Sequence, residues 1–161
     1  MDLTELSDIE PKFQELSPDE LSEIQQFTLL WSLFESRKLD RRGSIEKIEE
    51  KVNALNIEAI QCEPVLDYFK QRYYPNETES DYFDGLNINN CIVKSRIGVT
   101  LRGETLDPYE LLIVCLIIIY RYRNNLFHGE KWVYGIKDQK QNFENANELL
   151  KVCLRLFPDG I

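Results

Sequence analysis

The feature that most constrains the fold is the apolar run LLIVCLIII, which extends from Leu111 to Ile119. Helix signals lie on both sides of this run. Asp107 and Glu110 form a capping box with Pro108 at the first helical position, and Gly129 is a natural terminator. The pattern predicts a helix over 108–127, about 30 Å long at 1.5 Å per residue. Because its middle is apolar on every side, other elements must enclose it, as in the centre of a helical bundle.

Four further segments show the periodicity and capping residues of amphipathic helices: 18–37, 44–53, 63–73 and 142–157. The region 75–106 is less regular. Within it, 88–99 is compatible with a short helix or an extended piece, and a minor β-hairpin over 92–101 is an alternative because apolar residues alternate around Gly98. The sequence therefore predicts an all-α, single-domain helical bundle, with that hairpin as its one optional departure.

The chain has 161 residues, 43% of them hydrophobic, which suits one domain over 1–161 with an acidic N-terminal segment, 1–16. Nothing resembles a signal peptide, and the longest apolar run is far shorter than the roughly 18 residues that span a bilayer. We therefore expect a cytoplasmic protein without membrane contact.

Four widely spaced cysteines and one histidine give no metal-binding pattern, so we expect no metal and no cofactor. The cysteines are interpreted as small hydrophobes in a reduced compartment. The cysteines could form disulfides only in an oxidising compartment.

Charge is unevenly distributed along the chain. Residues 1–90 carry 9 basic and 20 acidic side chains, a net of −11, whereas residues 91–161 carry 10 and 8, a net of +2. The total of −9 opposes binding to a phosphate backbone. However, several basic residues are close in sequence to the end of the 108–127 helix and are compatible with a local positive groove: Lys94, Arg96, Arg102, Arg121, Arg123 and Lys131.

The sequence RNNLFHG, from Arg123 to Gly129, contains the only histidine. Histidine exchanges protons near neutral pH, and arginine binds phosphate through a planar fork. Asn124 and His128 share a helix face, so Asn124 could orient the imidazole or contact the sugar or phosphate. Arg123 lies about 140° away from His128 around the helix. The two converge on one phosphate if the helix unwinds at Gly129 or if a second copy packs against the first.

Residues beside this segment are candidates for substrate contact. Arg121 could bind substrate or make a structural ion pair, Tyr122 and Trp132 could stack on a base, and Lys131 adds positive charge. Core packing or a dimer seam is the preferred role for Tyr120. His128 also has a purely structural interpretation, as a residue that interacts with the last carbonyls of the helix.

The string RNNLFHG resembles the signature of the HEPN superfamily (higher eukaryotes and prokaryotes nucleotide-binding domains), in which Arg, commonly followed by Asn, precedes His by a short spacer. The resemblance implies an all-α, often dimeric protein. It also implies a metal-independent endoribonuclease that cleaves RNA at a composite Arg and His site at the interface of a homodimer. Such a protein would be a toxin or an anti-phage defence effector, and its partner would be a cognate antitoxin or regulatory protein. Arg123, Asn124 and His128 would then be catalytic.

In such a site, His128 would act as general base or acid and Arg123 would stabilise the charged phosphate. The alternative is a HEPN-like module that binds a nucleotide or protein without cleaving anything, such as an antitoxin, immunity protein or adaptor. The charge of −9 favours this alternative, and the complete motif favours the nuclease.

Overall fold

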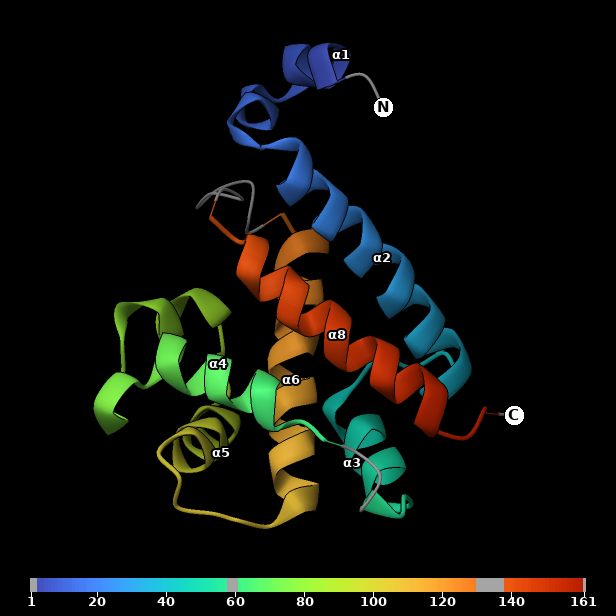
Figure 1. The fold of residues 1–161 in the computed structure, drawn as a ribbon, viewed down its shortest axis with the longest axis vertical. Coiled ribbons are helices and arrows are strands. Elements are labelled where there is room, and N and C mark those ends of the chain that lie inside the picture. The colour runs from blue at the N-terminus through green and yellow to red at the C-terminus, as the bar shows by residue number, and fades with distance from the viewer. Residues whose placement is uncertain (1–2, 58–60, 130–137, 161) are drawn as a thin grey trace.

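The computed structural model describes residues 3–57, 61–129 and 138–160. Within these ranges every regular element is a helix and no strand is present, which confirms the all-α prediction (Figure 1). The elements are α1 (Leu3–Ile9), η1 (Pro11–Glu15), α2 (Pro18–Lys38), α3 (Ile45–Asn53), α4 (Glu63–Tyr73), η3 (Pro75–Glu77), η4 (Asp81–Leu86), α5 (Cys91–Leu101), α6 (Pro108–Phe127) and α8 (Lys140–Leu156).

Helix α6 is central, as its apolar sequence predicts. Every residue from Leu112 to Ile119 is buried, and α6 contacts α3, α4, α5 and η4. Its bounds match the predicted 108–127, with the Asp107 side chain accepting a hydrogen bond from the Tyr109 N–H at 3.1 Å. The buried residues form one continuous core around it.

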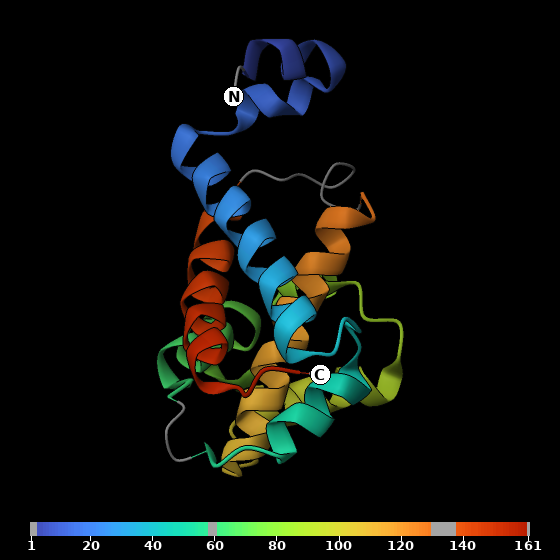
Figure 2. The same cartoon turned by 90° about the vertical axis from the view of Figure 1, so that its right-hand side faces the viewer.

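Helices α2 and α8 pack along each other beside α6 (Figures 1 and 2). At the start of α2, the Ser17 hydroxyl accepts a hydrogen bond from the Glu20 N–H, and the Glu20 carboxylate accepts one from the Ser17 N–H, so the predicted capping box is present. At its end, the buried Lys38 ammonium donates to the carbonyl of Phe157 and to Asp159, both at 2.7 Å. The chain after α8 is thereby fastened to α2.

The alternative of a β-hairpin over 92–101 is wrong, because these residues lie in α5. The Asn90 side chain accepts hydrogen bonds from the N–H groups of Ile92 and Val93 and so starts the helix. Ile97 and Leu101, four residues apart, are buried on its inner face. Gly98 is needed for close packing rather than for a turn, since a Cβ there would lie 2.7 Å from the Tyr74 hydroxyl oxygen.

The acidic N-terminal segment forms α1 and η1, two short helices that the sequence did not predict individually. Figures 1 and 2 show them beyond the N-terminal end of α2, away from the main bundle. Ser7 is the buried residue of α1.

Candidate functional site

The predicted motif lies at the C-terminal end of α6. His128 caps this helix with nearly helical dihedrals (φ −88°, ψ 8°), and its N–H donates to the Asn124 carbonyl at 2.9 Å. Gly129 follows with φ of +80°, the left-handed conformation expected of a terminating glycine. The helix therefore unwinds only after His128. Arg123 and His128 remain splayed by about 140°, and unwinding does not bring them together.

The imidazole of His128 is exposed, and within the described residues it makes no hydrogen bond or ion pair. The preceding residue, Phe127, is 54% exposed. Phe127 was not predicted to belong to the site, because an apolar residue between Leu126 and the motif histidine suggests a place in the core. A solvent-facing aromatic beside an unengaged imidazole makes this helix end a chemically accessible surface.

Arg123 is held against α2. One of its Nη atoms donates to the Asn124 amide oxygen at 3.1 Å, and the other lies 4.0 Å from a carboxylate oxygen of Glu35. Its guanidinium carbon also lies 5.3 Å from the centre of the Phe127 ring. Glu35 is itself fixed, accepting hydrogen bonds from the Trp31 indole at 3.0 Å and the Gly43 N–H at 2.9 Å. The position of the arginine is thus determined by two helices.

The two motif asparagines have different environments. Asn124 accepts a bond from Arg123, and no contact with the imidazole is present among the described residues. Asn125 is only 1% exposed, and its amide donates to the carbonyls of Gly85 at 3.1 Å and Leu86 at 3.4 Å. Asn125 therefore fastens η4 to α6. Nothing in the sequence distinguishes this structural asparagine from its neighbour.

Two predicted substrate-binding residues have structural contacts instead. Arg121 donates from Nε to the Leu86 carbonyl at 3.0 Å and from Nη2 to the Asn87 carbonyl at 2.8 Å. Tyr122 is buried, and its hydroxyl shares a 2.6 Å hydrogen bond with that of Tyr73. Burial raises the pKa of Tyr122 well above its ordinary value. A side chain enclosed in this way cannot stack on a base, so Tyr122 is excluded from the proposed site.

The remaining predicted contact residues, Lys131 and Trp132, lie outside the described residues. Tyr120 stacks on Trp31 with ring centres 5.8 Å apart. This contact joins α6 to α2 and agrees with a packing role for Tyr120.

Two of the basic residues that are close in sequence, Arg96 and Arg102, lie away from the motif. Arg96 binds Glu49 and makes a two-pronged contact with Glu110, at the opposite end of α6 and about 20 Å from the motif at 1.5 Å per residue. Arg102 pairs with Glu104 at 3.1 Å. Because α5 packs beside the start of α6, it carries these cations away from His128. Arg96 and Arg102 therefore do not contribute to a positive groove there, and Lys131 lies outside the described residues.

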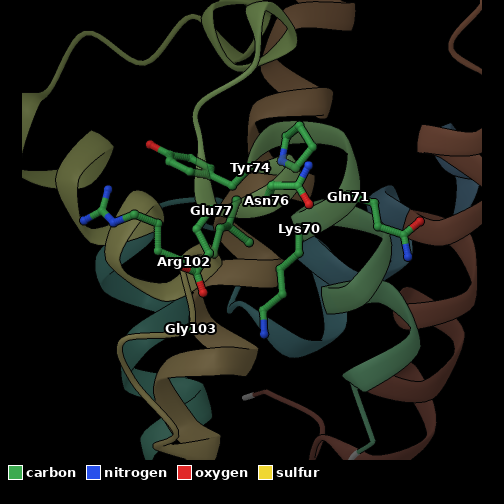
Figure 3. Close-up of a pocket in the computed structure, with 9 residues that line it drawn as sticks. Lys70, Gln71, Tyr74, Asn76, Glu77, Arg102 and Gly103 are labelled. Carbon is green, nitrogen blue, oxygen red and sulfur yellow. The ribbon is translucent and has the colours of Figure 1, made fainter.

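Two of the cavities formed by the described residues lie beside α4, away from the motif. One, of about 400 Å³, is bounded by the ends of α4 and α5 and by η3 (Figure 3). Its charged lining residues include Lys70, Glu77 and Arg102, and Arg102 is already paired with Glu104. The other, of about 490 Å³, lies between α4, η4 and α8.

Among the described residues, no group of three His, Cys, Asp or Glu side chains is placed to hold a metal ion. The cysteines are free, and burial raises the pKa of the Cys153 thiol. No described helix combines the length and apolarity needed to cross a membrane.

No protein-family model, curated protein or solved structure matches this chain. Function therefore has to be inferred from the chemistry of the residues themselves.

Proposed function

We propose that this protein is a metal-independent endoribonuclease of the HEPN type, with Arg123 and His128 in a composite site between two copies of the chain. The observation that carries the proposal is the helix end itself. An exposed histidine caps an intact helix, and an arginine that lies 4.0 Å from a carboxylate of a second helix is about 140° around the same axis. Since one copy does not direct both groups at one phosphate, a two-fold dimer that joins two such ends completes the site.

In this site, His128 of one protomer would take the proton from the ribose 2′-OH. The 2′-oxygen would attack the phosphorus, and the histidine of the second copy would protonate the departing 5′-oxygen. The products would be a 2′,3′-cyclic phosphate and a 5′-hydroxyl. Arg123 would exchange its long contact with Glu35, at 4.0 Å, for the phosphate oxygens and stabilise their developing charge. Asn124, already bonded to Arg123, would keep the guanidinium oriented.

The corresponding biological role is that of a cytoplasmic toxin or anti-phage effector, restrained by a cognate antitoxin or regulatory protein. This role follows from the resemblance of the motif. It predicts that expression of the free protein slows growth and that His128→Ala relieves the effect.

The direct test is cleavage of labelled RNA by purified protein in EDTA. We expect His128→Ala and Arg123→Ala to abolish cleavage, Arg123→Lys to restore it only in part, and Asn124→Ala to reduce it mildly. Arg155→Ala is a matched control, since Arg155 is an exposed arginine at the C-terminal end of α8. DNA of the same sequence should resist cleavage because it has no 2′-OH.

Circular dichroism distinguishes loss of chemistry from loss of fold, because both motif variants should retain the helicity of the wild type. Light scattering should report a dimer at micromolar concentration. Cleavage that persists in both folded variants would refute the assignment of Arg123 and His128.

A second candidate is the HEPN-like module that binds a nucleotide or protein without cleavage. The pairing of Arg96 and Arg102 with carboxylates favours it, because these cations are not available to neutralise an RNA backbone. Wild-type protein that leaves RNA intact in EDTA while remaining folded would select this function.

A further inference from the structure

The cavity between α4, η4 and α8 contains an arginine that has no carboxylate partner among the described residues. Arg72 is half-buried, and no carboxylate of the described residues lies within 4.0 Å of its guanidinium. Its Nε is buried and has no hydrogen-bond partner there. Arg96 and Arg102, by contrast, are both paired with glutamates. Since a partly buried cation without a counter-ion is unfavourable, an anion in this cavity would stabilise it.

An aromatic ring lies directly beside this cation. The guanidinium carbon of Arg72 is 4.3 Å from the centre of the Tyr82 ring. Tyr82 is nevertheless 61% exposed, so much of the ring is open to solvent. Nucleic-acid bases of any identity can stack on such rings. The cavity thus combines an unpaired cation with an open stacking surface.

Hydrogen bonds fix the backbone segments that carry these two side chains. The Ser80 hydroxyl donates to the Arg72 carbonyl at 2.6 Å, and the Ser80 N–H donates to the Tyr73 carbonyl at 2.8 Å. Next to Tyr82, Phe83 is buried and packs against the Tyr74 ring with centres 5.2 Å apart. The start of η4 is therefore fixed across the end of α4, which places Tyr82 over Arg72.

The rest of the lining is mostly polar and uncharged. Gln71 comes from α4, and Gln141 and Asn145 come from the first turns of α8. Amide side chains both donate and accept hydrogen bonds, as recognition of base edges requires. Glu144 is the one carboxylate of the lining, and it lies 3.4 Å from the ammonium of Lys140.

We propose that this cavity binds one nucleotide, with its phosphate on Arg72 and its base against Tyr82. The volume of about 490 Å³ is in the range of small-molecule sites. The nucleotide could belong to a single-stranded RNA or be a free nucleoside monophosphate, since both present the same phosphate and base. The RNA source rests on the proposed function. In support of it, η4, which carries Tyr82, is also bonded to the motif helix through Asn125 and Gly85.

The test measures binding in the full-length His128→Ala protein, so that any RNA stays intact. Fluorescence anisotropy with a short labelled single-stranded RNA and calorimetry with AMP and UMP provide two separate arms. We expect Arg72→Gln and Tyr82→Ala each to weaken binding at least about fivefold, the lower end of the effect of one stacked base. Tyr82→Phe should retain affinity, and Arg155→Gln is the surface control.

The two binding assays distinguish RNA from a free nucleotide as the ligand. They also distinguish failure of this site from failure of the proposed nuclease. Binding of RNA but not of mononucleotides assigns the cavity to a strand, and the reverse assigns it to a free nucleotide. Nucleotide binding by a wild-type protein that cleaves no RNA would refute the proposed nuclease activity and support this site. Wild-type affinity for both ligands in folded Arg72→Gln and Tyr82→Ala proteins would overturn it.

Discussion

Replacing Asn125 with alanine should destabilise the fold, whereas the same change at Asn124 should not. Asn125 is buried and donates to the Gly85 carbonyl at 3.1 Å and to the Leu86 carbonyl at 3.4 Å, and it accepts from Asn87 at 3.4 Å. Asn124 is only partly buried, and its side chain contacts that of Arg123. Adjacent residues of one type therefore provide an internally matched pair.

The expected magnitude follows from the individual bonds. The shortest bond contributes about 1 kcal/mol, and the two longer ones contribute less. Because its loss leaves the Gly85 carbonyl without this partner, the expected cost is that of an unsatisfied buried group, about 1–3 kcal/mol, rather than the net value of the bond. The Leu86 carbonyl keeps its bond from Arg121. Asn125→Ala should thus lower the free energy of unfolding by about 2–3 kcal/mol, and Asn124→Ala by no more than about 0.5 kcal/mol.

Urea unfolding followed by circular dichroism measures both values. A thermal scan should show a fall in Tm of about 5–10 °C for Asn125→Ala, since each kcal/mol shifts a chain of this size by about 2–4 °C. If the two variants were equally stable within about 0.5 kcal/mol, the role assigned to Asn125 in fastening η4 would be refuted.

Three further variants test other contacts by the same unfolding assay. Lys38 holds the pKa of Asp159 below its ordinary value of 3.8, so the carboxylate stabilises the fold above that pH and loses its effect as pH falls through the lowered pKa. Asp159→Asn should therefore be less stable than wild type at neutral pH and equal to it in strong acid; a gap that persists in acid would contradict this. Ser17→Ala should cost about 1 kcal/mol by removing the cap of α2, and Ser17→Asp should restore it. Gly129→Ala should cost about 1–2 kcal/mol because φ is +80°, with Gly129→Asn less affected; an unchanged stability would show that this backbone conformation carries no strain.

The helices with strong local signals were predictable from sequence. The capping residues at Ser17 and Asp107 and the terminator at Gly129 act on their neighbours alone, so their effects can be read without knowing the fold. Helix α5 was ambiguous because its apolar residues suit either a strand or a helix. Packing of Ile97 and Leu101 against the core decides in favour of the helix.

The motif could be located from sequence, but its surroundings could not. Nothing local distinguishes Asn124 from Asn125, or shows that Tyr122 meets Tyr73 from a distant helix. Arg96 and Arg102 are close to the motif in sequence but not in the fold, because the turn between α5 and α6 separates them from it. Arg72 and Tyr82 are ten residues apart, and only the fold of the intervening segment brings them together.

The contact between Arg123 and Glu35 links the motif to α2. Glu35 lies near the C-terminal end of α2, a helix of 21 residues and therefore about 30 Å long. Helix α1 lies beyond the opposite end of α2, outside the bundle (Figures 1 and 2). Helix α2 therefore connects α1 to the carboxylate beside the motif arginine, and a displacement of its C-terminal turn would move that carboxylate. A protein that bound α1 would therefore contact a segment joined directly to the helix that positions Glu35.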